Sequence, residues 1–413
     1  MLQKIYTLLT YILPLVVRLG GFFNVKLKAT YAGRKGIQKA LDQFQGEQPL
    51  WIHVASYGEF EQIIPLLQKL KDNPLPPKIF VTVFSPSGIE PVQKNTLVDG
   101  YCYLPWDHPK SVRAFVEQLQ PSLLIVVRQE FWYHVLKETT LKKIPVISFG
   151  SRFTKDHFFF KFWGRPYRKL LQKIDHFFLQ DHASQKWLKE KGILQTTVAG
   201  DSRMDRVLQT AAAVDTYAEI DAFIGAHPCL VAGSTWPEDY SLFENFFNAF
   251  PDDWKLIIAP HEIGATAISA LQKKLPMPNA LWSEWKKNRP TNIPVLILDC
   301  YGMLRSIYAK ATLAYVGGGM AKRGLHNILE PAAFGIPILI GPKHQQFREA
   351  TDLIASGGVF SVSKSSDWDA VFHELQSVKK RTAAGSINYS YVHSKKGATQ
   401  QLLAYLEKHR LLN

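Results

Sequence analysis

Short apolar segments alternate with longer amphipathic segments along most of the chain after residue 50. The apolar segments are rich in Val, Ile and Phe and are bordered by turn residues, which is typical of buried strands. Segments 63–70 and 111–119 have the apolar spacing of helices. The strands expected in the first half are WIHV (51–54), KIFVTV (78–83), SLLIVV (122–127), IPVISF (144–149) and HFFLQ (176–180).

A second series of strands follows a polar stretch at 200–220, so we place a domain boundary near residue 205. Alternating strands and helices predict parallel sheets with crossover helices, and therefore two similarly sized α/β domains. The cleft between such domains is the default ligand site. The strands expected in the second half are CLVAG (229–233), WKLIIAP (254–260), PVLIL (294–298), TLAYVGG (312–318) and IPILIG (336–341).

The chain therefore divides into four expected parts. Residues 1–36 form an N-terminal membrane-associated segment, 37–205 a first domain, 206–395 a second domain, and 396–413 a C-terminal helix that can pack back on the first domain. The first of these parts is unusual because its apolar stretch at 5–23 contains Pro14 and Arg18.

The uncharged run from Ile5 to Val17 is shorter than the roughly 20 residues that a membrane-spanning helix needs. An apolar segment with a basic flank suits an anchor lying on an anionic cytoplasmic leaflet. A buried first helix of the domain is the alternative interpretation. The basic flank consists of Lys26, Lys28, Arg34 and Lys35.

The charge balance favours an anionic partner. The 413 residues include 49 Lys and Arg against 35 Asp and Glu, a net charge of +14. Nucleic acid, an anionic membrane and a phosphorylated substrate all fit, but no basic repeat or zinc-finger spacing supports nucleic acid. Cys102, Cys229 and Cys300 lie far apart in or beside apolar runs and are expected to be free thiols, so no metal or redox site is indicated.

The densest chemical signal is YVGGGMAKRGLHNILEPAAFG, residues 315–335. Gly317, Gly318 and Gly319 follow an expected strand and would let a ligand approach the backbone closely. Lys322 and Arg323 come next, and then a helix with Asn327 as its N-cap and Glu330 in its first turn. Asn327 and Glu330 can be a capping pair, or they can bind a nucleotide, with phosphate at the helix start and a ribose on Glu330. The two interpretations are compatible.

Two further strand ends of the second domain carry polar residues. AGSTWPED (232–239) supplies Gly233, Ser234 and Thr235, and IIAPHEIG (257–264) supplies Pro260 and His261. A lone histidine is usually structural, but the carboxyl ends of parallel strands are where α/β sheets bind ligands.

The corresponding segments of the first domain are SYGE (56–59), SPSG (85–88), RQEFWYH (128–134) and GSRF (150–153). Glu59 and Glu130 both follow expected strands. A single Glu at a helix start is commonly there because it complements the helix dipole, and that explanation would suffice for Glu59 alone. Glu61, two residues on, is expected to be a solvated first-turn residue.

Taken together and in this order, the motifs resemble those of 3-deoxy-D-manno-octulosonic acid (Kdo) transferases. The resemblance is collinear over about residues 1–360. It is carried by WIHVASYGE, FSPSGIE, YLPWDHP, QEFWYH, AGSTWPED, GGGMAKRGLHNILEPAAFG and GPKHQQF.

This resemblance implies a GT-B glycosyltransferase with two Rossmann-like domains, an inverting reaction and no metal or cofactor. It implies CMP-Kdo as donor, a lipid A precursor as acceptor, and a place on the cytoplasmic face of the inner membrane. Glu59 falls on the position of the catalytic base and Glu130 on the second acidic motif. Donor binding is expected at Gly233, Ser234, Thr235, Pro260, His261, Gly317, Gly318, Gly319, Lys322, Arg323, Asn327 and Glu330, and acceptor binding at Ser56, Gly58, Ser85 and Arg152.

The sequence also departs from the family pattern. Trp132-Tyr133-His134 replaces Trp-Pro-Asn, Arg128 stands where an acidic residue is common, and Ala259-Pro260-His261 replaces Pro-Arg-His. These changes resemble a divergent, Bacteroidetes-like branch and leave the number of Kdo units open. The alternatives are another GT-B enzyme that uses a UDP-sugar, a sugar-nucleotide epimerase, and a non-catalytic nucleotide- or lipid-binding protein.

Overall fold

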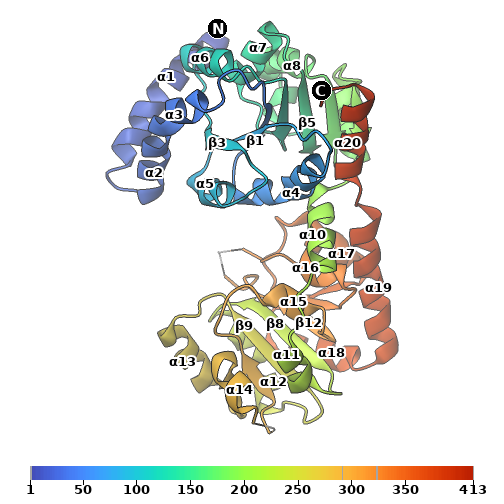
Figure 1. Ribbon diagram of the computed structural model, residues 1–413. Helices are drawn as coiled ribbons and strands as arrows, with labels where there is room; N and C mark the ends of the chain where they lie inside the picture. Colours follow the sequence, from blue (N-terminus) through green and yellow to red (C-terminus); the bar gives the residue numbers. More distant parts are fainter. Residues whose placement is uncertain (1, 291, 322–323, 413) are drawn as a thin grey trace. The chain divides into compact units, whose positions relative to one another are not determined.

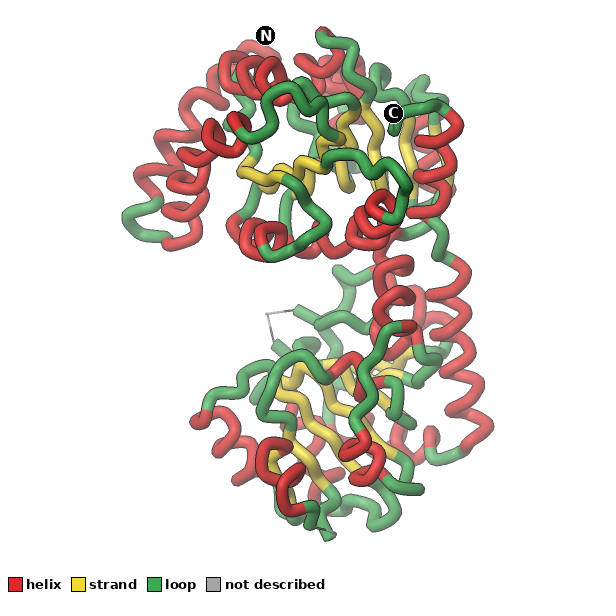
Figure 2. Tube along the Cα trace, viewed as in Figure 1, coloured by secondary structure: helices red, strands yellow, loops and turns green. Residues whose placement is uncertain are grey.

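The computed structural model describes residues 2–290, 292–321 and 324–412 of the chain. These residues form two compact units (Figure 1). Unit 1 comprises Met1–Arg206 and Lys395–Asn413, and unit 2 comprises Val207–Ser394. Both are α/β units built on a parallel sheet, as the alternation of strands and helices predicts (Figure 2).

The sheet of unit 1 has seven strands in the order β3-β2-β1-β4-β5-β6-β7, and all neighbouring pairs are parallel. The five strands expected from the first half of the sequence are all present in it. The strands are β1 (Leu50–Val54), β2 (Ile79–Val83), β3 (Gly100–Tyr103), β4 (Leu123–Val127), β5 (Val146–Ser151), β6 (His176–Leu179) and β7 (Thr196–Val198).

Helices cover both faces of this sheet. The helices are α3 (Ile37–Asp42), α4 (Tyr57–Lys71), α5 (Pro86–Gln93), α6 (Pro109–Leu119), α7 (Tyr133–Leu141), α8 (Arg165–Leu171), α9 (His182–Glu190) and α20 (Ala398–Lys408). Successive residues of a strand point to opposite faces. Trp51 therefore belongs to the core on the face covered by α3 and by α6 to α9, whereas Ile52 belongs to the core on the face covered by α4, α5 and α20. The C-terminal helix lies in unit 1, where Leu402 and Leu406 are fully buried.

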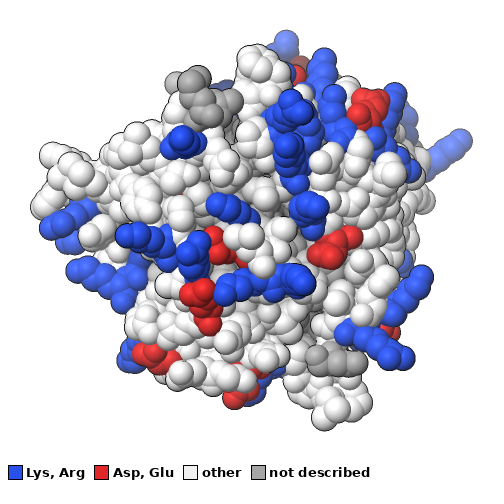
Figure 3. Space-filling view, turned by 90° about the horizontal axis from the view of Figure 1, so that it is seen from above, with Lys and Arg blue, Asp and Glu red and all other residues white. Residues whose placement is uncertain are grey.

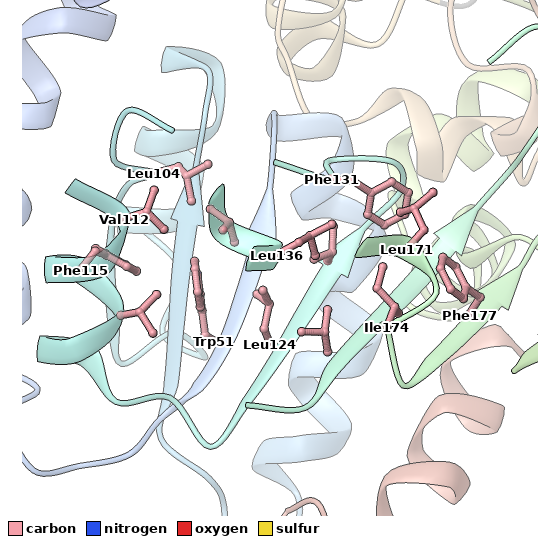
Figure 4. Packing of buried hydrophobic residues seen from close by; sticks show 14 of the residues in the cluster. Trp51, Leu104, Val112, Phe115, Leu124, Phe131, Leu136, Leu171, Ile174 and Phe177 are labelled. Atoms are coloured by element: carbon pink, nitrogen blue, oxygen red, sulfur yellow. The ribbon is translucent and has the colours of Figure 1, made fainter. Parts of the chain in front are cut away.

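The core on the α6 side is largely aromatic and aliphatic (Figure 4). Phe115 of α6 reaches the sheet and meets the Trp51 ring with 5.1 Å between ring centroids. Leu124 of β4 lies beside Trp51 in the same layer. This packing fixes β1 and β4 side by side, which matters because the candidate acidic residues follow these two strands.

Two helices precede the first strand of unit 1, namely α1 (Leu2–Gly20) and α2 (Val25–Gly33). Tyr6 ties α1 to the domain, because its hydroxyl donates a 2.5 Å hydrogen bond to Asp107, which in turn accepts the N–H groups of His134 and Val135. The opposite face of α1 is exposed and apolar. The expected basic flank is only partly correct, because Arg34 is buried and donates to the carbonyl oxygens of Leu104 and Thr30.

The sheet of unit 2 also has seven parallel strands, in the order β10-β11-β9-β8-β12-β13-β14. The five strands expected from the second half of the sequence are present. The strands are β8 (Cys229–Thr235), β9 (Lys255–Pro260), β10 (Asn279–Leu281), β11 (Val295–Ile297), β12 (Leu313–Val316), β13 (Ile338–Ile340) and β14 (Val359–Ser361).

The helices of unit 2 are short except at its C-terminal end. They are α11 (Ala218–Ile224), α12 (Glu244–Asn248), α13 (Ala265–Lys274), α14 (Trp282–Asn288), α15 (Leu304–Tyr308), α16 (Leu329–Ala333), α17 (Arg348–Ser356), α18 (Ser365–Leu375) and α19 (Val378–Ser394). α10 (Ser202–Ala212) begins in unit 1 and ends in unit 2. Cys102 and Cys229 are buried free thiols, as expected, and Cys300 is half-buried.

Candidate active site

The carboxyl ends of β1, β2 and β4 meet at one edge of the unit 1 sheet, since the three strands are adjacent and parallel. The backbone N–H of Ser85 donates to the carbonyl oxygen of Ala55 at 2.7 Å, which joins the loop after β2 to the loop after β1. Ser56 and Ser85 lie in these two loops, and Gly58 and Glu59 lie in the first turn of α4, which follows the first of them. The structure thus brings together four of the residues that the sequence singled out.

Glu59 lies in the first turn of α4, where Ser56 is the N-cap residue but makes no side-chain cap. The Glu59 carboxylate turns back instead and accepts the N–H of Ala55 at 2.5 Å. Burial raises the pKa of Glu59 to about 7, the N–H of Ala55 lowers it, and the charges of Glu130 and Arg128 act in opposite directions. Glu59 is therefore fixed to the backbone that precedes α4, and it is a carboxylate whose pKa suits proton transfer near neutral pH.

Glu130 lies in the loop after β4, beside the buried His53 of β1. The indole N–H of Trp132 lies 3.2 Å from both the Glu130 carboxylate and His53 Nε2. The other ring nitrogen of His53 contacts the hydroxyl of Thr82 at 2.9 Å. Burial lowers the pKa of His53 to about 3, so the imidazole is neutral and its 3.9 Å approach to Glu130 is not an ion pair. Burial also raises the pKa of Glu130.

Sequence reasoning missed the residues that support these two carboxylates. Trp132 donates to Glu130 and to His53, and Thr82 holds the other ring nitrogen of His53. Gln62 of α4 connects Gly58 to Arg128. His53 is a polar residue within the apolar strand WIHV. That contrast is the signal in the sequence that could have identified it.

Two sequence-based expectations for unit 1 need qualification. Arg152, an expected acceptor-binding residue, lies at the end of β5 and pairs with Asp181, with 3.4 Å between Nε and the carboxylate oxygen. Glu61 is not simply solvated: it accepts a 2.9 Å hydrogen bond from Arg206 and is only one-quarter exposed.

In unit 2, the expected donor residues gather at the carboxyl ends of β8, β9 and β12. Ser234 is half-buried and has a left-handed backbone with φ of +53°, which interrupts the pairing of β8 with β9. Thr235 is buried and its hydroxyl meets that of Tyr240 at 2.9 Å, so it points into the core. The N–H of His261, which follows Pro260, donates to the Thr235 carbonyl oxygen. This bond joins the ends of β8 and β9.

The glycine loop is packed against its own chain more closely than the sequence suggested. A Cβ on Gly317 would lie 2.3 Å from the carbonyl oxygen of Ser234, and one on Gly319 would lie 2.8 Å from the backbone of Gly341. The N–H groups of Gly317 and Gly318 donate to Gly233 and Asp239. These two amides are therefore not available to a phosphate, contrary to expectation, and the glycines serve close backbone packing.

Asp239 organises this region and was not identified from the sequence. Its buried carboxylate accepts the N–H groups of Trp236 and Gly318 and the hydroxyl of Tyr315, which joins the ends of β8 and β12. Burial raises its pKa, and these three donors lower it.

Aromatic and imidazole rings line the same edge. The Trp236 ring stacks on that of His261 with 4.2 Å between centroids, and its indole N–H donates to His326 Nε2 at 3.0 Å. Burial lowers the pKa of His326 to about 4, so it is neutral near pH 7. Its Nδ1 then carries the remaining proton and can donate a hydrogen bond.

Asn327 and Glu330 lie at the start of α16, whose N-cap is Ile328 rather than the expected Asn327. Asn327 accepts the N–H of Leu329 and its amide group donates to Glu330 at 3.3 Å. The two residues thus form the pair that the sequence indicated, but bonded side chain to side chain. Arg305 of α15, which sequence reasoning missed, lies 3.9 Å from the Glu330 carboxylate. The expected donor residues Lys322 and Arg323 lie outside the described residues.

Comparison with known proteins gives a consistent result. Residues 29–206 match the family model described as 3-deoxy-D-manno-octulosonic-acid transferase (kdotransferase). The chain is 28% identical over 339 residues to the 3-deoxy-D-manno-octulosonic acid transferase of Aquifex aeolicus, covering 80% of this chain and 87% of the relative. It is also 28% identical over 378 residues to the transferase of the same name from Haemophilus influenzae, covering 87% of each.

A solved structure shares the fold at low sequence identity. UDP-GlcNAc 2-epimerase from Neisseria meningitidis, bound to UDP-GlcNAc, superposes with a TM-score of 0.61 at 13% identity, over 87% of this chain and 100% of that one. This likeness concerns the two-domain α/β architecture.

Proposed function

Because the chain belongs to the Kdo transferase family of glycosyltransferases, we propose that it transfers Kdo from CMP-Kdo to a lipid A precursor in lipopolysaccharide biosynthesis. The observation that carries this proposal within the structure is Glu59. It is a carboxylate with a pKa of about 7, held at the end of a central strand beside a second carboxylate, Glu130. Perturbed acids in such a position are candidates for proton transfer.

In the proposed reaction, a hydroxyl oxygen of the acceptor sugar forms a bond to the anomeric carbon of Kdo. The bond from that carbon to the phosphate oxygen breaks, and CMP leaves with the bonding electrons. Attack from the face opposite the leaving group inverts the configuration. Glu59 accepts the hydroxyl proton as the new bond forms, which is worth about 10² to 10⁴-fold in rate.

Glu130 has a supporting role in this proposal. Trp132 fixes its carboxylate by hydrogen bonding, and its negative charge raises the pKa of Glu59. A base whose pKa lies near the working pH accepts a proton readily, and about half of it is still in the ionised form that can act as a base.

We assign the nucleotide donor to unit 2. Glu330 would accept the ribose hydroxyls, because it is the carboxylate at the start of α16 and Asn327 holds it in place. Since the amides of Gly317 and Gly318 are engaged, the leaving phosphate needs other donors. Ser234, His261 and the Nδ1–H of His326 are the polar groups of the carboxyl edge that fit this role.

The acceptor is a phosphorylated lipid, and unit 1 has the surface that such an acceptor requires. It holds 33 Lys and Arg against 18 Asp and Glu, whereas unit 2 holds 16 against 17, so the net positive charge of the chain belongs to unit 1. Figure 3 shows basic side chains outnumbering acidic ones on the end of unit 1 that bears α6, α7 and α8. We propose that this unit contacts an anionic membrane surface through α1 and the α1–α2 loop.

The exposed face of α1 supports this contact. Leu8, Leu9, Leu15, Val16 and Leu19 are each more than half exposed. No helix within residues 2–290, 292–321 and 324–412 is long and apolar enough to cross a bilayer.

The decisive experiment follows release of CMP from CMP-Kdo with and without a lipid A precursor. Release that depends on the acceptor supports the transferase, and release without it, or no release, contradicts the proposal. Glu59→Gln should keep CMP binding and lose at least about 100-fold in turnover, because the amide cannot accept the proton. Turnover near the wild-type value would remove Glu59 as the base.

A titration of the wild-type protein with CMP and with UDP separates the donor classes. Tighter binding of CMP is expected. Preference for UDP would favour a UDP-sugar enzyme of the same fold.

A further inference from the structure

Arg128 occupies a strained position beside Glu59. It directly follows β4 and has a φ of +61°, in the left-handed region that costs about 1 kcal/mol or more for a residue with a side chain. Its backbone is held from both sides: its N–H donates to the Phe149 carbonyl oxygen at 2.8 Å, and its own carbonyl accepts the hydroxyl of Ser151. The surrounding structure therefore imposes this conformation, which turns the side chain toward α4.

The Arg128 side chain is attached to the first turns of α4. Its Nε donates to the side-chain oxygen of Gln62 at 3.0 Å, and the amide group of Gln62 donates to the Gly58 carbonyl oxygen at 2.8 Å. Gln62 is buried, and the hydroxyl of Ser202 donates to the same oxygen at 3.3 Å. This chain of contacts places a guanidinium next to the residue that precedes Glu59.

The charged groups around Glu59 come from the end of β4, the loop after it, and helices α4 and α10. Glu130 belongs to the loop after β4, Arg128 to the end of β4, and Glu61 of α4 is paired with Arg206 of α10. His53 is neutral and adds no charge. Arg128 is the cation that acts on Glu59 against both its burial and the repulsion of Glu130.

Arg128 also acts on the buried Asp201. Burial raises the pKa of this carboxyl group, but the guanidinium groups of Arg203 and Arg128 outweigh it and lower the pKa overall. Arg203 contacts Asp201 directly at 2.7 Å. Asp201 therefore keeps a close partner when Arg128 is replaced.

We propose that Arg128 is a positioning residue for catalysis: its strained backbone and its bond to Gln62 hold a positive charge beside Glu59, where it keeps the base ionised next to Glu130. This inference rests on the proposed role of Glu59. It also assigns a role to the arginine that this chain has at a position where the family pattern commonly has an acidic residue.

The test is the pH dependence of kcat/KM for wild type, Arg128→Met and Arg128→Lys. Loss of the positive charge raises the pKa of Glu59, so the acid limb of the profile should move to higher pH in the Met variant. A shift of one pH unit lowers activity about tenfold at pH 6 and leaves it near the wild-type value at pH 9. The Lys variant keeps the charge and should shift less.

Arg128→Gly serves as a second variant because glycine adopts the left-handed backbone without strain. It should fold at least as stably as wild type, by thermal unfolding, and show the same shift of the acid limb. Arg113→Met is the matched control, since Arg113 of α6 pairs with Glu138 of α7 and not with Glu59 or Gln62. It should leave the profile unchanged.

Two results would overturn the role of Arg128: equal loss of activity at every pH, which indicates direct substrate binding or disturbed folding, or no change at any pH. Glu59→Gln is measured in parallel and should be inactive throughout the range. An active Glu59→Gln variant would contradict the proposed base itself. The two failures are thus distinguishable.

Discussion

Arg34 is a buried cation that interacts with backbone carbonyl oxygens and with the faces of aromatic rings. Its guanidinium donates to the carbonyl oxygens of Leu104 and Thr30, and it lies 4.1 Å from the centre of the Trp106 ring. Burial lowers its pKa to about 10, so it remains protonated at neutral pH. This residue connects α2 to the segments after β2 and β3, and so fixes the N-terminal helices to the sheet.

Arg34→Lys should therefore destabilise the protein although it preserves the charge. A lysine cannot reach both carbonyl oxygens in the fork geometry of a guanidinium, and each buried group left unpaired costs about 1–3 kcal/mol. Chemical denaturation should show a loss of about 2–4 kcal/mol. Lys35→Met, at the exposed neighbouring position, should change stability little. Equal effects at both positions would contradict the buried role of Arg34.

The residues to which we assign chemistry were partly accessible from the sequence. Glu59 and Glu130 could be found because each follows an apolar strand, where ligands bind α/β sheets. Arg128 was visible only as a departure from the family pattern and His53 only as a polar residue in an apolar strand. Their roles and that of Asp239 could not be predicted, because they come from hydrogen bonds and charges between segments far apart in the chain.

Among the elements, the central strands were predictable and the edge strands were not. The ten expected strands are all present, and the four missed ones, β3, β7, β10 and β14, are the two edges of each sheet. Central strands of a parallel sheet are buried on both faces and form continuous apolar runs. Edge strands are short and partly exposed: every residue of Thr196–Val198 and of Asn279–Leu281 is half-buried, which leaves no apolar run to detect.

Close helix packing in unit 2 depends on a glycine inside α19. A Cβ on Gly385 would lie 2.0 Å from the Gly335 carbonyl oxygen, after α16. Gly385→Ala gains up to about 1 kcal/mol in helix propensity, but overpacking against backbone typically costs about 1–3 kcal/mol, so the clash should outweigh the gain.

Calorimetry of the full chain should show the Gly385→Ala variant unfolding at a temperature a few degrees lower. Ser386→Ala, at an exposed position of the same helix, is the control and should unfold at or slightly above the wild-type temperature. If Gly385→Ala raised the unfolding temperature, α19 would be able to move away from Gly335 without a loss of stability.

At the scale of the whole molecule, charge and exposed apolar surface belong to the same unit. Unit 1 carries the excess of basic residues, and it also carries Phe22 and Phe23, which are 80% and 94% exposed in the loop between α1 and α2. Burying one such side chain in an apolar phase gains about 1.5–3 kcal/mol. The proposed membrane contact would therefore have two contributions, one sensitive to salt and one not.

The double variant Phe22→Ser/Phe23→Ser should therefore bind vesicles containing anionic phospholipid at least about tenfold more weakly, since two partly inserted rings contribute about 2 kcal/mol. CMP affinity should not change, because unit 2 is proposed to hold the nucleotide. Leu75→Ser, which removes an 85% exposed side chain in the loop after α4, is the matched control and should bind vesicles as wild type does. Raising the salt concentration should weaken binding of all three proteins, because it screens the basic residues that they share. Unchanged vesicle binding of the double variant would show that this loop is not the point of contact.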